Sequence, residues 1–237
     1  MGEIRAKNLL CRRGSFILDI EELTINTGEK IALLGENGCG KTTLLFILAG
    51  LLPHKGELIY EGARWDELTA AKRSEYMSFL PQEADVLFNL TVEELSTLTL
   101  SGVKLNGEER EAILEATEMT AFLPRIYHSL SGGEKRRAML ARVLLQTRDF
   151  LFLDEPTAPL DLRHSARLMN YIASTKSCIV AAMHDLNLAV RHFDRFLLMK
   201  NGKILFDKGK HELDTESLEE IYSIKFKRLD NYFIPEH

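Results

Sequence analysis

Short apolar segments alternate with turn residues along most of this chain. Residues 4–10 and 15–25 have the spacing of strands, and residues 30–34 form a continuous apolar run, as expected of a strand buried in a parallel sheet. A glycine-rich turn follows, and residues 41–49 have the pattern of a helix that ends at Gly50. This succession of strand, turn and helix predicts an α/β core.

The pattern changes between about residues 84 and 147. Three segments there have helical spacing with no convincing strand between them, at 91–98, 108–119 and 134–146. The acids of the second segment are interpreted as a solvated face rather than a metal site. We expect a single domain, residues 1–237, in which a helical subdomain (84–147) is inserted into an α/β core (1–83 and 148–237).

Five more strands are expected on the same grounds, at 57–60, 77–80, 150–153, 178–183 and 196–200. The last of them leads into Asn201-Gly202 and another apolar run, which together predict a two-residue β-hairpin. A helix over 163–174 would connect two parallel strands.

The composition narrows the class of protein. The 237 residues are 45% hydrophobic and 27% charged, which is typical of a globular chain and excludes a disordered one. The formal net charge of −5 disfavours nucleic acid as the main partner. The three cysteines form no CxxC pair, which excludes a cysteine zinc site and fits a reducing cytosol. The longest apolar run, 44–52, is far shorter than the roughly 18 residues of a spanning helix, so the chain is expected not to cross a membrane.

The segment after the first buried strand, Gly35-Glu36-Asn37-Gly38-Cys39-Gly40-Lys41-Thr42, matches the pattern G-x-x-x-x-G-K-[ST]. Its glycines let successive backbone N–H groups converge on phosphate oxygens, and the following helix points its positive end at the same place. Lys41 is then placed to reach the β- and γ-phosphates, and the Thr42 hydroxyl to bind Mg²⁺. A nucleotide-binding P-loop is the favoured interpretation, and a glycine-rich surface turn is the alternative.

Two acids, Asp154 and Glu155, end the apolar run at 150–153. Ligands of open α/β sheets bind at the carboxyl ends of the strands, so both acids are expected to face the phosphates. Asp154 is suited to hold Mg²⁺, and Glu155 is the candidate general base for the attacking water. Gln82 and His184 also follow predicted strands; Gln82 is expected near Mg²⁺ and water, and His184 near the γ-phosphate. Ordinary solvated strand ends are the alternative for each.

A second anion site is predicted at Leu130-Ser131-Gly132-Gly133-Glu134, which opens the helix at 134–146. A serine and two glycines at a helix start offer backbone donors together with the helix dipole. One triphosphate does not need two such sites from one chain, and a simple P-loop kinase lacks the second.

With this segment the chain resembles the ATPase subunits of ATP-binding-cassette (ABC) transporters. The shared elements, in the family's order, are the P-loop, Gln82, the segment 130–134, the strand ending at Glu155, the Leu160-Asp161 turn and His184. The resemblance covers almost the whole chain. It implies an α/β P-loop NTPase core with a mostly parallel sheet, an N-terminal antiparallel β subdomain and an inserted helical subdomain.

The resemblance also implies an activity and partners. Two copies would pack head to tail, with each ATP between one P-loop and the partner's Ser131-Gly132-Gly133, and with Asp161 running across the interface. Hydrolysis of ATP to ADP and phosphate would drive transport through polytopic permease subunits, to which the region around Gln82 transmits closure. The chain would lie peripherally at the cytoplasmic face of the inner or plasma membrane, in a system with an extracytoplasmic substrate-binding protein.

The expected site residues fall into three sets. The catalytic set is Lys41, Gln82, Glu155 and His184. The set for Mg²⁺ is Thr42, Gln82 and Asp154. The set for ATP is Gly35, Asn37, Gly38, Cys39, Gly40, Lys41, Thr42, Thr43, Ser131, Gly132, Gly133 and Asp161.

Two short segments, at 184–187 and in the tail at 222–230, are similar to the corresponding segments of importer subunits for iron chelates, haem and vitamin B12. The leading hypothesis is therefore a homodimeric importer ATPase for such a metal chelate. A soluble ATPase of iron–sulfur assembly and an exporter subunit are the alternatives.

Two of the chain's departures from the family pattern bear on the nucleotide site. No aromatic residue stands at 11–14, where the family stacks one on adenine, so Arg12 or Phe16 is expected to take that role unless this stretch is a solvated edge. Cys39 occupies a P-loop position where a small residue is usual. One interpretation is that Cys39 is simply a small residue. The other hypothesis is that the nearby helix N-terminus lowers the pKa of its thiol, so that alkylation blocks ATP binding.

Overall fold

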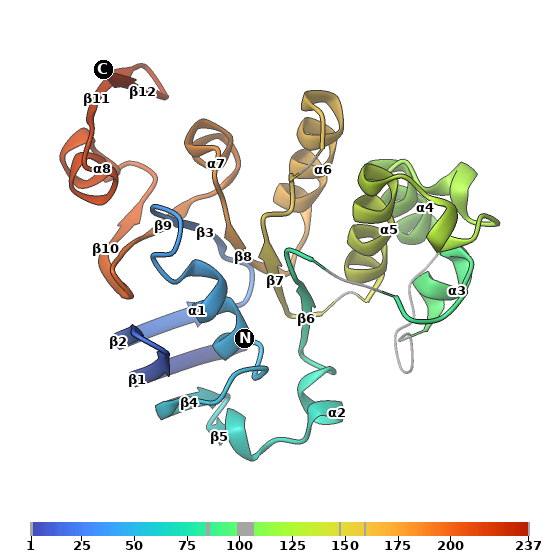
Figure 1. Cartoon of the computed structure of the whole chain (residues 1–237), viewed down its shortest axis with the longest axis horizontal. Helices are drawn as coiled ribbons and strands as arrows, with labels where there is room; N and C mark the ends of the chain where they lie inside the picture. The colour runs from blue at the N-terminus through green and yellow to red at the C-terminus, as the bar shows by residue number, and fades with distance from the viewer. Residues whose placement is uncertain (1, 84–85, 99–106, 147, 159, 237) are drawn as a thin grey trace.

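The computed structural model describes residues 2–83, 86–98, 107–146, 148–158 and 160–236. It consists of an N-terminal antiparallel sheet, a central mostly parallel sheet and a group of helices that projects to one side (Figure 1). This arrangement confirms the predicted fold class.

The N-terminal sheet is antiparallel throughout and has the strand order β2-β1-β4-β5. Its strands are β1 (Glu3–Arg13), β2 (Phe16–Asn26), β4 (Lys55–Tyr60) and β5 (Ala63–Arg64). β1 and β2 form a hairpin whose turn includes Gly14, with a φ of 59° that glycine adopts readily. The β1–β2 hairpin places the end of β1 beside the start of β2, at the edge of the site described below.

The central sheet has the order β10-β9-β3-β8-β7-β6, and only the β9–β10 pair is antiparallel. Its strands are β3 (Lys30–Leu34), β6 (Met77–Leu80), β7 (Phe150–Asp154), β8 (Cys178–Ala182), β9 (Arg195–Lys200) and β10 (Lys203–Gly209). Because β3, β6, β7 and β8 are parallel, their carboxyl ends lie along one edge of the sheet, and the loops that leave them are neighbours.

The helices form two groups, one in the α/β core and one between β6 and β7. Those of the core are α1 (Lys41–Leu48), α2 (Ala70–Arg73), α6 (Leu162–Ser174), α7 (Leu186–His192) and α8 (Thr215–Tyr222). Those between β6 and β7 are α3 (Val92–Thr97), α4 (Gly107–Ala116) and α5 (Gly132–Leu145). Single 3₁₀ turns occupy Trp65–Glu67, Thr120–Phe122 and Tyr127–Ser129. The tail forms a hairpin of β11 (Lys225–Leu229) and β12 (Tyr232–Glu236).

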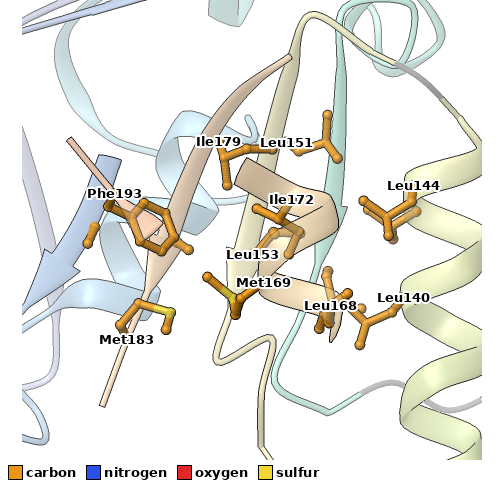
Figure 2. Packing of buried hydrophobic residues seen from close by; sticks show 14 of the residues in the cluster. Leu140, Leu144, Leu151, Leu153, Leu168, Met169, Ile172, Ile179, Met183 and Phe193 are labelled. Atoms are coloured by element: carbon orange, nitrogen blue, oxygen red, sulfur yellow. The ribbon is translucent and has the colours of Figure 1, made fainter. Parts of the chain in front are cut away.

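The central strands are buried on both faces, and alternate side chains enter two cores. Ile31 and Leu33 of β3 pack in a core with α1 and the N-terminal sheet, whereas Ala32 and Leu34 pack in a core with the helices on the other side. Figure 2 shows the second core, in which α5 and α6 cover β7 and β8. Each fully buried aliphatic side chain contributes roughly 1.5–3 kcal/mol, so both faces of the sheet are held firmly.

The local predictions agree with the structure where the pattern is strong. The Asn201-Gly202 hairpin is confirmed, because β9 and β10 pair across it. The helix expected over 108–119 ends earlier, since Glu118 has a φ of 53° and cannot continue it. Six short elements were not predicted: β5, α2, α7, α8, β11 and β12. The expected subdomain boundaries at 84 and 147 lie outside the described residues.

A search of the described residues finds no helix with the length and apolar character needed to span a bilayer.

Candidate functional site

The P-loop connects β3 to α1 and uses backbone conformations that favour glycine. Gly35, Gly38 and Gly40 have φ values of 148°, 79° and 112°. A Cβ at Gly35 would lie 2.2 Å from the Met199 carbonyl oxygen and 2.8 Å from the Cys39 Sγ. Glycine at position 35 is therefore required by the close approach of β9 as well as by φ.

The Lys41 side chain turns back over this loop. Its Nζ donates to the carbonyl oxygens of Gly35 at 2.6 Å and Glu36 at 3.0 Å. Lys41 is only 6% exposed, so its ammonium group is held within the loop rather than in solvent. A phosphate bound at the loop would offer this ammonium a charged acceptor, which makes a stronger hydrogen bond than a carbonyl.

Two distant segments support the P-loop backbone. Gly202, in the β9–β10 turn, donates its N–H to the Cys39 carbonyl oxygen at 2.9 Å. Gly35 donates its N–H to the Tyr222 hydroxyl oxygen at 3.2 Å, and burial raises the pKa of Tyr222 to about 12. The sequence reasoning missed Tyr222, because no local pattern signals a contact between residues so far apart along the chain.

An open pocket of about 1040 Å³ lies over the P-loop. Three other loops contribute one residue each: Gln82 after β6, Glu155 after β7 and His184 after β8. The P-loop and α1 residues that line it are Asn37, Gly38, Gly40, Lys41, Thr42 and Thr43. The structure thus brings predicted residues from four segments together at the carboxyl ends of parallel strands, where such sheets bind ligands.

Asp154 ends β7 and is 1% exposed. Neither of its carboxylate oxygens makes a hydrogen bond of ordinary geometry to a described residue. Burial raises the pKa of this carboxyl group, and the adjacent Thr42 hydroxyl opposes part of the rise. A buried carboxylate without donors is costly unless a cation satisfies it. Thr42 and Asp154, with Gln82 on the pocket wall, therefore fit the oxygen ligands that Mg²⁺ prefers.

Glu155 follows with a φ of 49°, in the left-handed region. Such a backbone conformation costs a non-glycine residue about 1–3 kcal/mol and is concentrated at functional sites. The Glu155 Oε1 lies 2.5 Å from the Nε2 of His184, and both residues line the pocket. Two of the four side chains predicted for catalysis are therefore in direct contact.

The predicted second anion site lies outside this pocket, at the start of α5. The Ser131 Oγ accepts a hydrogen bond from the Glu134 backbone, and the Glu134 carboxylate accepts one from the Ser131 N–H at 2.7 Å. A Cβ added at Gly132 or Gly133 would meet nothing within 4 Å. This end of α5 is thus an accessible helix N-terminus that does not line the pocket of its own chain.

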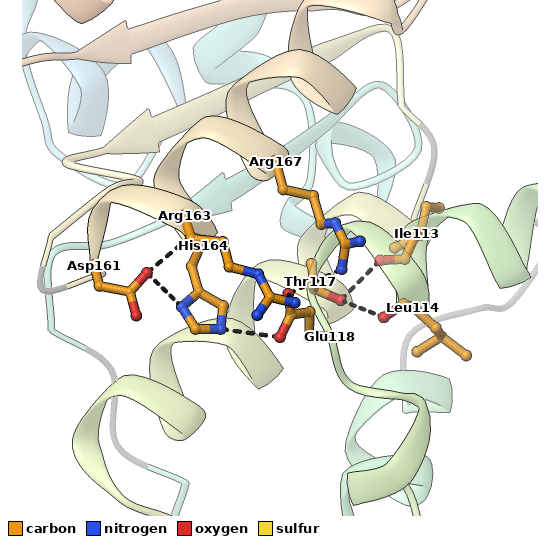
Figure 3. Close-up of polar contacts among 8 residues, drawn as sticks. All are labelled: Ile113, Leu114, Thr117, Glu118, Asp161, Arg163, His164 and Arg167. Atoms are coloured by element: carbon orange, nitrogen blue, oxygen red, sulfur yellow. Dashed lines mark hydrogen bonds and ion pairs between the residues drawn. The ribbon is translucent and has the colours of Figure 1, made fainter.

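Asp161 caps the N-terminus of α6, also outside the pocket (Figure 3). Its Oδ1 accepts from the His164 backbone at 2.9 Å and lies 2.7 Å from the His164 Nδ1. The His164 Nε2 lies 3.0 Å from the Oε2 of Glu118, which also pairs with Arg163 and Arg167. Glu118, expected on a solvated face, instead connects the α4 segment to α6.

The lowered pKa predicted for the Cys39 thiol is wrong. Burial raises the pKa of its thiol, and the neighbouring Lys41 offsets only part of this rise. Cys39 is 5% exposed, whereas the argument from the helix N-terminus assumed an accessible thiol. The structure therefore does not support the expectation that the Cys39 thiolate is readily alkylated.

The first hairpin supplies the outer edge of the pocket through Arg13, Gly14 and Phe16. Of the two expected stacking residues, Phe16 lies at the pocket and Arg12 does not. Successive side chains of a strand point to opposite faces, so only one of the two adjacent arginines can face the site. The sequence reasoning offered Arg12 or Phe16 and did not name Arg13, because the face of β1 that meets the P-loop is set by tertiary packing.

A P-loop after a buried strand, a buried carboxylate at the end of a neighbouring strand and an accessible helix tipped with glycine define a nucleotide-hydrolysing cassette. A family model described as ABC transporter matches residues 18–158. The chain belongs to the ABC transporter family, and it is an ATPase of that family.

The chain is similar to proteins of this family over nearly its whole length. It is 36% identical over 234 residues to the Hemin import ATP-binding protein HmuV of Vibrio cholerae, with 92% of this chain and 90% of that protein covered. It is 34% identical over 215 residues to the Petrobactin import ATP-binding protein FpuC of Bacillus anthracis, with 85% and 79% covered. The ATP-binding cassette MJ0796, solved as a dimer bound to ADP and phosphate, has a TM-score of 0.75 at 25% identity, with 87% and 98% covered. These similarities confirm the predicted family.

Proposed function

We propose that this chain is the ATP-hydrolysing subunit of a membrane importer for an iron chelate, either haem or a ferric siderophore. The convergence of Lys41, Gln82, Glu155 and His184 on one pocket carries the ATPase assignment. The iron-chelate assignment is supported by the similarity to hemin and petrobactin import proteins.

ATP binds with its phosphates on the P-loop. Backbone N–H groups at the start of α1 and the Lys41 ammonium contact the phosphate oxygens. Phe16 lies at the pocket edge, where its ring can stack on the adenine. Lys41 then exchanges carbonyl acceptors of its own loop for the stronger phosphate acceptors.

Hydrolysis uses the residues at the ends of β6, β7 and β8. Glu155 accepts the proton of the attacking water, and the His184 contact fixes the direction of the Glu155 carboxylate. Gln82, which also lines the pocket, orients the water. Thr42, Gln82 and Asp154 would hold Mg²⁺, which would supply positive charge to the phosphate groups during hydrolysis.

Each ATP is completed by a second copy of the chain. Within one chain the N-terminus of α5 lies outside the P-loop pocket, while Ser131, Gly132 and Gly133 leave room for a ligand. Head-to-tail packing would place the partner's Ser131 against the γ-phosphate, with Asp161 at the interface. Loss of that phosphate then loosens the dimer, because it removes the contact common to both halves.

The permease docks on the face formed by α2, β6 and α5. A hollow of about 580 Å³ lies there and includes the exposed side chains of Leu51 and Leu98. Leu87 and Phe88, which follow Gln82, are 90% and 70% exposed, and apolar exposure of this extent is typical of an interaction surface. The chain would then sit peripherally on the cytoplasmic side of the membrane, in a system that includes an extracytoplasmic binding protein.

Reconstitution tests the proposal. The chain and its permease are placed in liposomes with ATP on the side of this chain and haem or a ferric siderophore on the other. We expect ATP-dependent accumulation of the iron chelate, no accumulation with Lys41→Met, and loss of permease binding with Phe88→Asp. Leu229→Asp, at an exposed leucine of the tail hairpin, is the control and is expected to keep both activities. ATP hydrolysis without movement of either chelate would contradict the importer proposal.

A further inference from the structure

Arg136 lies one turn into α5, after Gly132 and Gly133 at the N-terminus of that helix. It is only 7% exposed, and burial lowers the pKa of its guanidinium despite the nearby acids. An arginine is rarely buried to this extent unless its donors are used.

Among the residues that the structure describes, the guanidinium donates four hydrogen bonds, each to a backbone carbonyl oxygen. Its Nη1 contacts the oxygens of Pro81 at 2.5 Å and Gln82 at 3.0 Å. Its Nη2 contacts the oxygens of Asp154 at 2.5 Å and Glu155 at 2.9 Å. One side chain therefore joins α5 to the two loops that carry the proposed water-orienting glutamine and general base.

The chemistry of the group makes this connection rigid. The planar guanidinium presents its donors in a fixed fork, so the carbonyls at the ends of β6 and β7 are held at a set distance from each other and from α5. The carbonyls past the strand ends have left the sheet ladder, so the arginine also satisfies polar groups that are otherwise costly to bury. A displacement of α5 must therefore move Gln82 and Glu155, or break charge-assisted bonds.

We propose that Arg136 is a positioning residue that makes the two ATP sites of the dimer cooperative. The N-terminus of α5 contacts ATP held by the partner copy, and Arg136 passes the resulting position of α5 to Glu155 and Gln82 of its own chain. Occupancy of one site thereby sets the catalytic geometry of the other. This inference rests on the proposed head-to-tail dimer.

The test compares Arg136→Gln and Arg136→Lys with Lys135→Gln, which removes a positive charge from the preceding position of the same helix. ATP affinity of the isolated chain is measured by titration, and kcat and the Hill coefficient are measured by steady-state hydrolysis with the permease. We expect both Arg136 variants to bind ATP within about twofold of the wild type, because Arg136 does not line the pocket. We expect kcat to fall about 10–100-fold for Arg136→Gln, as is usual when catalytic groups shift by about 1 Å.

The Hill coefficient separates positioning from a merely structural role. It is expected to fall from above about 1.5 in the wild type to about 1 in Arg136→Gln, and to recover in part in Arg136→Lys. Lys135→Gln should keep the wild-type value. Unchanged cooperativity in folded Arg136 variants, or equal losses of ATP affinity and kcat, would overturn the inference. Arg136→Lys keeps the charge and serves as the decisive variant if Arg136→Gln does not fold. A wild type that is itself non-cooperative and monomeric would refute the dimer rather than the role of Arg136 alone.

Discussion

Replacement of Asp154 by asparagine is expected to stabilise the ligand-free protein while it abolishes ATP hydrolysis. The Asp154 carboxylate is 1% exposed, and neither oxygen has an ordinary hydrogen bond among the described residues. Its ionised form is therefore costly to bury, and burial accordingly raises its pKa. The asparagine amide has nearly the same shape and no net charge. Relief of the desolvation cost is expected to raise the free energy of unfolding by about 1–3 kcal/mol.

Urea unfolding followed by the fluorescence of Trp65 measures this change. Trp65 is the chain's single tryptophan and is 1% exposed, so its emission reports the loss of the surrounding core. Mg²⁺ and ATP at 100 times Kd should add about 2.7 kcal/mol to the free energy of unfolding of the wild type and much less to that of Asp154→Asn, so that the stability advantage of the variant is offset by nearly that amount.

Asp19→Asn is the control for this comparison, because the Asp19 carboxylate is 41% exposed and its replacement should change stability by less than about 0.5 kcal/mol. Lower stability of Asp154→Asn without ligand would refute the view that Asp154 is an unsatisfied buried anion. An equal gain in the free energy of unfolding of both proteins from Mg²⁺ and ATP would refute its role as a cation ligand.

Three further predictions concern the P-loop, the α4–α6 contact and the start of α5. Gly35→Ala should lower the free energy of unfolding by at least about 2 kcal/mol, because its Cβ would lie 2.2 Å from the Met199 carbonyl oxygen; a urea midpoint equal to that of the wild type would contradict this. Burial alone would raise the pKa of the Glu118 carboxyl, but His164 and two arginines hold this pKa below its ordinary 4.5. The stabilising effect of the Glu118 carboxylate is therefore complete above pH 4.5 and is lost as the pH falls through the pKa of the folded state. In thermal melts the small deficit of Glu118→Gln, roughly 0.5 kcal/mol or less, should therefore disappear in acid, and a deficit that persists at about pH 3 would exclude this explanation. Ser131→Arg should leave ATP affinity of the isolated chain unchanged but lower phosphate release at least about 100-fold, and normal turnover would show that this residue does not contact nucleotide.

The sequence predicts elements best where the hydrophobic pattern alone decides them. The apolar runs at β3 and β6 match the observed strands at both ends, because these strands are buried by neighbours on both faces. The end of α4 was misplaced, because Glu118 leaves the helix to meet cations on α6, a contact that the local pattern does not contain. The tail hairpin was not predicted, for a similar reason: Asn187 makes two hydrogen bonds to the Phe233 backbone, and these position β12.

In the candidate site, too, the features set by the local sequence pattern were predictable and those set by contacts between distant segments were not. Lys41, Glu155 and His184 were predictable because each stands directly after a buried strand or a glycine-rich turn, and parallel strand ends meet. The state of the Cys39 thiol was not predictable, because burial by residues distant in sequence outweighs the helix N-terminus. Arg136 was missed for the same reason, since its four acceptors lie on two other segments of the chain.

The central claim is that two copies of this chain enclose ATP and hydrolyse it with Glu155. Sedimentation equilibrium of Glu155→Gln with Mg²⁺ and ATP, combined with a nucleotide count, tests this most directly. The account predicts a species of twice the 27.0 kDa of one chain, with two intact ATP molecules, and slow hydrolysis. A variant that remains at 27.0 kDa with bound ATP, or that hydrolyses ATP at the wild-type rate, would contradict it.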